Sequence, residues 1–123
     1  MKNGKENFKT DFKLRVYNWT LRLIKVIDFL SKDGSSQIMA RQVLRSGTSI
    51  GANYIEAQAA SSKKDFTNFL HHSLKSANES KFWLALLRDS GKMRREDADY
   101  LLRELDELSR ILGSSLITVK GRR

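Results

Sequence analysis

Histidine and carboxylate side chains are the first candidates for chemistry in this sequence, because they could bind a metal ion. A di-iron site in a helical bundle needs Glu-x-x-His pairs on two helices. Neither Glu56 nor Glu79 has a histidine three residues later. His71 and His72 are adjacent and point about 100° apart on a helix, so we expect them at a surface or an interface. The sequence contains no cysteine, which excludes thiolate ligands and disulfides. We therefore expect no metal and no cofactor.

Two short motifs resemble fragments of enzyme sites. Ser61 and Lys64 have the S-x-x-K spacing of some acyl-transfer enzymes, but the partner motifs are absent and a capped helix start explains the same letters. The stretch SGTSIGA at residues 46–52 lacks the residue order of a phosphate-binding loop and follows no predicted strand. No acid, base and oxyanion site come together, so we expect no catalytic activity.

Lysine and arginine residues give the stronger functional signal. The formal net charge is +9, an excess that attracts phosphate backbones through long-range, salt-sensitive forces. Near the N-terminus lysines recur every three or four residues, which would align them along one side of a helix. Such residues neutralise backbone charge and do not read base edges. The candidate nucleic-acid-binding residues are Lys2, Lys5, Lys9, Lys13, Lys63, Lys64, Lys120, Arg122 and Arg123.

Four helices are expected to position these residues. Apolar side chains recur at helical spacing in four segments that short polar breaks separate. We expect these stripes to form the core, with Phe12, Val16, Trp19, Leu23, Val26, Ile27 and Leu30 in the first segment and Leu101, Leu105, Leu108, Leu112 and Leu116 in the fourth. Ser62, followed by Asp65, predicts a capped start for the third helix, and Gly91 predicts its end. The absence of proline agrees with an all-helical chain. The predicted helices cover approximately residues 11–30, 36–60, 62–89 and 96–119.

Short loops between long amphipathic helices predict an all-α fold, an up-down-up-down antiparallel four-helix bundle. We expect residues 1–123 to form a single domain, with a basic N-terminal extension at about 1–10 and a basic tail at about 120–123. In such a bundle the nine candidate cations gather at one end of the molecule, against the acids Glu6, Asp11 and Asp65. The charges at the other end nearly cancel.

The second helix is poor in charge. Between residues 35 and 62 only Arg41, Arg45 and Glu56 are charged, and small or polar residues, Ser46 among them, lie opposite its apolar side. A solvated helix face would normally carry lysine and glutamate. We therefore expect this helix to be covered on both sides, which requires a second chain.

Glycines in the second helix point to close packing. Gly47 and Gly51 are four residues apart, and each costs about 1 kcal/mol relative to alanine inside a helix. We expect them to let a neighbouring backbone come close. The predicted packing and oligomer seam comprises Gly47, Ser49, Gly51, Asn53, Glu56 and Glu79.

Apolar residues outside the expected core also favour self-association. The first helix carries a second apolar face, and Phe82 and Leu86 lie on the outer side of the third helix. Four apolar residues together exceed what a monomer usually exposes. The second face of the first helix comprises Leu14, Tyr17, Leu21 and Ile24.

The N-terminal stretch MKNGKENFKTDF lacks the apolar segment of a secretory signal, and no window approaches the 18 or so apolar residues of a membrane span. We expect a cytoplasmic protein that does not associate with membranes.

Two stretches, LRSGTSIGANYIEAQAASSKKDF (44–66) and SLKSANESKFWLALLRDSGK (73–92), resemble the bacterial four-helix bundle family also called the 23S rRNA intervening-sequence protein family. The resemblance covers about residues 8–120 and implies an up-down bundle that assembles into a homopentameric ring. Some relatives are encoded in segments inserted into ribosomal RNA genes. Another relative, the accessory variability determinant of diversity-generating retroelements, binds nucleic acid and works with a reverse transcriptase. Ser76 stands where many relatives carry glutamate, which removes any ion pair that such a residue would make.

Charge and resemblance together favour a non-enzymatic, homo-oligomeric accessory protein that binds RNA or DNA independently of sequence, with RNA preferred through the family association. The alternative is an adaptor ring that docks a protein partner, such as a reverse transcriptase, without nucleic acid. Its docking surface would then be the aromatic face around Phe82 and Trp83.

Overall fold

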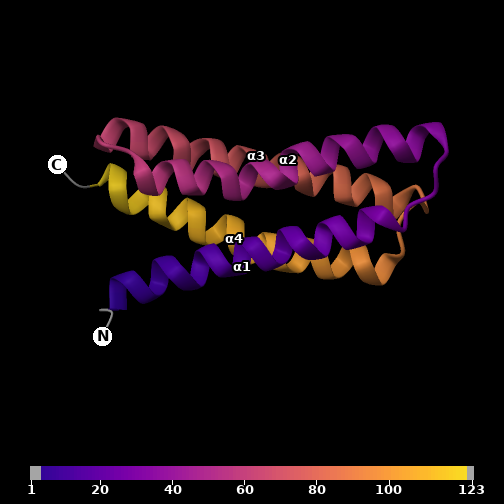
Figure 1. The fold of residues 1–123 in the computed structure, drawn as a ribbon, viewed down its shortest axis with the longest axis horizontal. Helices are drawn as coiled ribbons and strands as arrows, with labels where there is room; N and C mark the ends of the chain where they lie inside the picture. Colours follow the sequence, from indigo (N-terminus) through magenta and orange to yellow (C-terminus); the bar gives the residue numbers. More distant parts are fainter. Residues whose placement is uncertain (1–3, 122–123) are drawn as a thin grey trace.

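The computed structural model describes the backbone of residues 4–121 and the side chains of residues 11–121. Within residues 4–121 the secondary structure consists of four α-helices without any strand, which confirms the predicted all-α four-helix fold (Figure 1). The helices are α1 (Gly4–Asp28), α2 (Gly34–Ala59), α3 (Lys63–Asp89) and α4 (Arg95–Lys120).

The helix ends follow the local sequence signals. The Ser62 side chain caps α3 by accepting a hydrogen bond of 3.1 Å from the Asp65 amide. Gly91 ends the same helix with a positive φ of 76°, a conformation in which a Cβ atom would be strained. The first helix differs from the prediction, because it begins at Gly4 and not near residue 11. No proline or internal glycine interrupts residues 5–11, so nothing in this stretch stops the helix.

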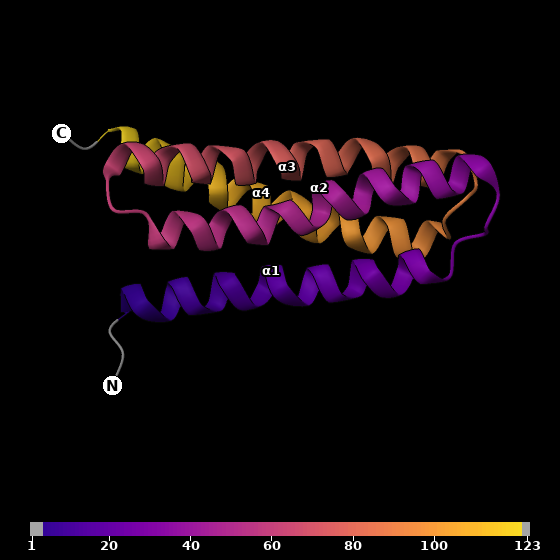
Figure 2. The same cartoon turned by 45° about the horizontal axis from the view of Figure 1, so that its top comes forward.

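Successive helices run in opposite directions, as the short loops predict (Figure 1, Figure 2). The start of α1, the turn between α2 and α3 and the end of α4 lie at one end of the bundle, here called the basic end. The loops from α1 to α2 and from α3 to α4 lie at the opposite end, here called the balanced end. The chain topology therefore brings together lysines that are far apart in the sequence.

The predicted apolar stripes form the core. All five leucines of the predicted α4 stripe are buried, and Trp19 of α1 is only 2% exposed. The Trp19 indole N–H donates a hydrogen bond of 3.0 Å to the backbone oxygen of Leu101, so its polar atom is satisfied inside the core. Seven predicted core residues of α1 are buried or half-buried: Phe12, Val16, Trp19, Leu23, Val26, Ile27 and Leu30.

Small residues let α2 and α3 pack closely. The Ser46 and Ser80 hydroxyls meet at 2.8 Å in the buried interface, and the Ser73 hydroxyl donates to the backbone oxygen of Ile50 at 2.7 Å. The expectation that Ser46 faces away from the core is therefore wrong. The buried arc of α2 is wider than its apolar stripe, because α2 packs against α3 as well as α1.

Gly47 and Gly51 are close-packing positions, as predicted, but their neighbours are side chains of α1 in the same chain. A Cβ atom at Gly47 would lie 2.4 Å from Leu23 Cδ2 and 3.4 Å from the Trp19 ring. A Cβ atom at Gly51 would lie 3.2 Å from Val16 Cγ1. Gly47 is buried against α1, so it takes part in helix packing within one chain.

Polar contacts fasten α1 to α4. Arg15 pairs with Glu104 at 2.6 Å, and the Arg22 guanidinium lies 4.4 Å from the centre of the Tyr100 ring. Between α1 and α2, by contrast, residues 11–121 form no hydrogen bond or ion pair. Over these residues the α1–α2 seam is therefore held by apolar packing.

Candidate nucleic-acid interface

Four of the predicted cations have described side chains, and all four are exposed at the basic end: Lys13, Lys63, Lys64 and Lys120. They come from the first part of α1, the first turn of α3 and the last turn of α4. The start of α1, the start of α3 and the end of α4 therefore lie at the same end of the bundle, as the helix order predicts. The exposed acids Asp11 and Asp65 lie on the same helix segments.

The remaining predicted cations are described less fully. Lys5 and Lys9 lie on α1 at intervals of four residues from Lys13, which places these three residues on one side of that helix. The side chains of Lys5 and Lys9 lie outside the described residues. Lys2, Arg122 and Arg123 lie outside the described residues altogether.

Lys63 and Lys64 occupy positions that local helix energetics disfavour. They are the first two residues of α3, where the helix dipole is positive and a like charge costs about 0.3–1 kcal/mol at low salt. Lys120, by contrast, lies in the last turn of α4, where a cation is favourable. The dipole of α3 therefore does not favour lysine at either of these two positions.

The other residues of the predicted seam lie partly exposed along α2 and α3. Ser49 and Asn53 are half-buried, and the Asn53 amide donates to the Ser49 backbone oxygen at 2.9 Å within α2. Glu56 is exposed. Glu79 pairs with Arg45 across the α2–α3 seam and accepts a hydrogen bond of 2.9 Å from the Trp83 indole. Glu79 thus links α2 to α3 within one chain.

Exposed apolar side chains occur where the sequence predicts them. The second face of α1 is exposed, with Tyr17 the most accessible at 58%. Phe82 is 60% exposed, and its ring packs edge-on against Trp83 at 5.1 Å between centroids. Sequence reasoning missed Ile38, which is also 60% exposed. Arg45 of α2 pairs with Glu79 of α3. Ile38 lies seven residues before Arg45 and Leu86 seven residues after Glu79, which is about two turns on each of these antiparallel helices, so Ile38 and Leu86 lie side by side. Ile38, Phe82 and Leu86 are called the distal patch.

The balanced end is fastened by an ion pair between its two loops. The Lys92 ammonium lies 2.7 Å from an Asp33 carboxylate oxygen, and the Ser31 hydroxyl donates to the other oxygen at 2.7 Å. The hydrogen bond from Lys92 is the main cause that holds the pKa of Asp33 far below its ordinary value, and that from Ser31 adds to it. The cations of this end are therefore already engaged or balanced by acids.

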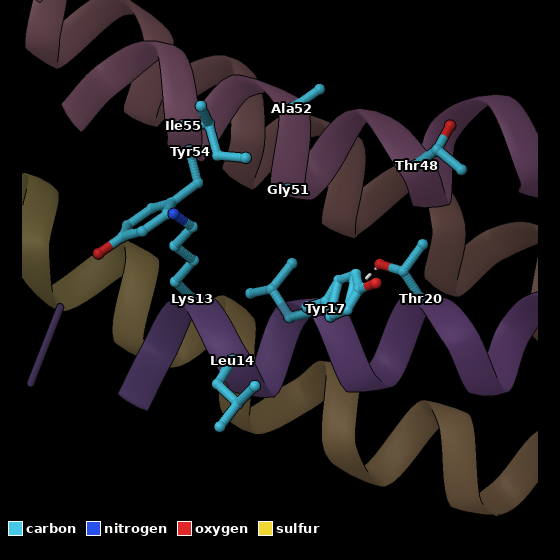
Figure 3. Close-up of a pocket in the computed structure, with 10 residues that line it drawn as sticks. Lys13, Leu14, Tyr17, Thr20, Thr48, Gly51, Ala52, Tyr54 and Ile55 are labelled. Atoms are coloured by element: carbon cyan, nitrogen blue, oxygen red, sulfur yellow. Dashed lines mark hydrogen bonds between the residues drawn. The ribbon is translucent and has the colours of Figure 1, made fainter. Parts of the chain in front are cut away.

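A groove between α1 and α2 was not predicted from the sequence. It has a volume of about 660 Å³ and opens between Tyr17 and Leu14 on α1 and Ala52 and Ile55 on α2 (Figure 3). The available signal was the small residue pair Gly51 and Ala52, which leaves space opposite the exposed face of α1.

His71 and His72 are both exposed on α3. Across residues 11–121, no three His, Cys, Asp or Glu side chains are grouped so that they could hold a metal ion. None of the four helices, over their described length, has the combination of length and apolar character that crossing a bilayer requires.

Comparisons with known proteins agree with this architecture. Residues 12–114 match the sequence profile described as 23S rRNA-intervening sequence protein. The fold is similar to the crystal structure of a protein of unknown function from the S23 ribosomal protein family of Bacteroides thetaiotaomicron, with a TM-score of 0.80 and 36% sequence identity. That similarity covers 85% of this chain and 97% of the other. No curated protein matches the chain. With a matching profile over most of its length and this shared bundle, the chain belongs to the 23S rRNA-intervening sequence protein family.

Proposed function

We propose that the protein is a non-enzymatic accessory protein that binds nucleic acid through its basic end, without reading base sequence. The observation that carries the proposal is the pair Lys63 and Lys64 at the start of α3, beside exposed cations of α1 and α4. Helix energetics disfavour these two lysines, whereas a phosphate backbone would favour them. Protein cations that neutralise phosphates release counterions, which supplies sequence-independent affinity.

Self-association would multiply this surface. The exposed apolar face of α1 and the distal patch leave two sides of the bundle without partners within the described residues. Single exposed apolar residues are ordinary, but contiguous patches mark interaction sites. A closed ring would place one basic end per chain on the same face, and five chains is the number that the family resemblance implies.

Binding of single-stranded RNA and of duplex DNA, measured against salt concentration, tests the proposal. The logarithm of the affinity should fall linearly with that of the salt concentration, with a slope of about 0.7 to 0.9 per phosphate neutralised. The variant Lys63→Glu/Lys64→Glu should bind both ligands more weakly and show a smaller slope.

A charge-matched control separates a local site from general attraction. Lys32→Glu/Arg95→Glu changes the net charge by the same amount at the balanced end. This control should retain most of the affinity of the unchanged protein. Equal losses in both double variants, or no binding at low salt, would rule out a site at the basic end.

The second candidate function is an adaptor that docks a protein partner. The distal patch favours it, because Phe82 and Ile38 are both 60% exposed. They lie near the end of α3 and the start of α2, away from the turn between these helices at the basic end. Aromatic anchors of this kind often dominate binding energy at interfaces. Affinity capture with and without nuclease distinguishes the two functions: partners retained after nuclease treatment, and lost in Phe82→Ser, would favour the adaptor.

A further inference from the structure

The groove between α1 and α2 has the composition of a ligand site. Its volume of about 660 Å³ lies within the range of about 300–1,000 Å³ that is common for small-molecule pockets. Leu14 and Tyr17 of α1 and Ile55 of α2 line it, and Gly51 lines it from the α2 backbone (Figure 3). The groove exists because Gly51 and Ala52 carry almost no side chain to fill the space.

The two threonine hydroxyls that line the groove are engaged within their own helices. The Thr20 hydroxyl donates to the Val16 backbone oxygen at 2.8 Å, and the Thr48 hydroxyl donates to the Leu44 backbone oxygen at 2.7 Å. These hydroxyl hydrogens are therefore not available to a ligand. The walls consequently suit an alkyl chain better than a polar ring, which would lose its own hydrogen bonds to water.

Lys13 provides a cation at one end of this apolar surface. Its side chain is exposed and extends from α1 towards Tyr54 on α2 (Figure 3). Within residues 11–121 it has no ion pair or hydrogen bond. The neighbouring Arg15, by contrast, is paired with Glu104. The groove therefore offers a long apolar wall that ends at an unpaired ammonium group.

We propose that this groove binds a long-chain carboxylate, with the alkyl chain between α1 and α2 and the carboxylate beside the Lys13 ammonium. Over residues 11–121 the α1–α2 seam has no polar contact that an alkyl chain would have to break. The site lies apart from the distal patch. It includes Leu14 and Tyr17 of the exposed α1 face, so a second copy of the chain is the competing occupant, and it shares Lys13 with the basic end.

Calorimetric titration with saturated carboxylates of eight, ten and twelve carbons, below their micelle-forming concentrations, tests this site. Binding should saturate at one ligand per chain. Each added CH₂ group should tighten it by up to about fourfold, which is the effect of fully burying a methylene. Dodecylammonium, which has the same tail and the opposite charge, should bind far more weakly.

Two pairs of variants locate the ligand. Lys13→Met should weaken dodecanoate binding about two- to fivefold, the range of a partly exposed ion pair. Lys25→Met removes an exposed lysine of the same helix outside the groove and should change nothing. Ala52→Trp fills the groove from an exposed position and should abolish binding, whereas Ala52→Ser should preserve it.

Sedimentation of the same samples identifies the competing occupant. Absence of saturable dodecanoate binding overturns the proposal, and so do equal effects of Lys13→Met and Lys25→Met. If Ala52→Trp dissociates an assembly while the unchanged protein binds no dodecanoate, the groove is occupied by a second copy of the chain. That result would overturn the ligand site and leave nucleic-acid binding to be judged by the salt titrations alone.

Discussion

At Gly47 an added methyl group would contact both Leu23 and Trp19, at 2.4 Å and 3.4 Å. Both neighbours are fully or almost fully buried, so neither can move without disturbing the α1–α2 seam. Gly113 provides the comparison, because it lies inside α4 and has no atom within 4 Å of the Cβ position. The two glycines are chemically identical and are distinguished only by what surrounds them.

We expect Gly47→Ala to lower the free energy of unfolding by about 1–3 kcal/mol, the usual cost of overpacking a core. Gly113→Ala should raise it by about 0.5–1 kcal/mol, because alanine has the higher helix propensity. Urea denaturation measures both values. A neutral Gly47→Ala would mean that the α1–α2 seam is looser than the structure describes.

Lys63 and Lys64 are a second test at the scale of residues. Lys63→Glu/Lys64→Glu places acids in the first turn of α3, where the helix dipole favours them, so the melting temperature should rise while nucleic-acid affinity falls. Opposite changes in stability and function are typical of residues kept for binding. If the melting temperature of this variant fell, its weaker nucleic-acid binding would be explained by damaged structure.

The contact between Lys92 and Asp33 joins two loops, and its effect belongs to the scale of elements. Because the pKa of Asp33 is lowered in the folded state from an ordinary value of 3.8, its contribution to stability is complete well above that value. It is lost as the pH falls below about 4. Asp33→Asn keeps a residue suited to the start of α2 and should make unfolding less dependent on pH in that range.

Thermal unfolding between pH 7 and pH 2 measures this effect. Lys92→Met should reproduce the altered pH dependence of Asp33→Asn, and the double variant should add little to either, because the two residues share one interaction. If both single variants kept the pH dependence of thermal unfolding that the unsubstituted protein has, the two loops would not be coupled through this pair.

The sequence predicted which segments are helical and which residues form most of the core. Leu101, Leu105 and the other buried α4 leucines were found by spacing alone, because the apolar side of an amphipathic helix faces the core. Ser46 was predicted to lie away from the core. Spacing along α2 does not show that Ser80, on another helix, is small enough to let the two hydroxyls meet. The groove escaped prediction for a related reason: it is defined by side chains that are missing, at Gly51 and Ala52, opposite a helix distant in sequence.

For the whole molecule, the exposed apolar side chains predict self-association. The apolar face of α1 and the distal patch together leave seven large apolar side chains exposed: Leu14, Tyr17, Leu21, Ile24, Ile38, Phe82 and Leu86. Sedimentation equilibrium at micromolar concentration should therefore give a mass several times 14.1 kDa. Leu21→Glu should reduce the mass, and Arg103→Glu, which adds an acid on the exposed side of α4, should not. A 14.1 kDa species for the unchanged protein would contradict the ring.

Lysines gather at the basic end, whereas charges of the balanced end are paired. This uneven distribution gives the molecule an electric dipole along its helix axes. Lys63 and Lys64 begin α3 and Lys120 ends α4, at the basic end, while at the other end Arg88 and Lys92 are neutralised by Asp99 and Asp33. A polyanion therefore exerts a torque on the protein before any contact is made, so that the molecule approaches with its lysine-bearing end first. Encounters in that orientation are productive, and the association rate should exceed that of an equally charged molecule with evenly spread cations.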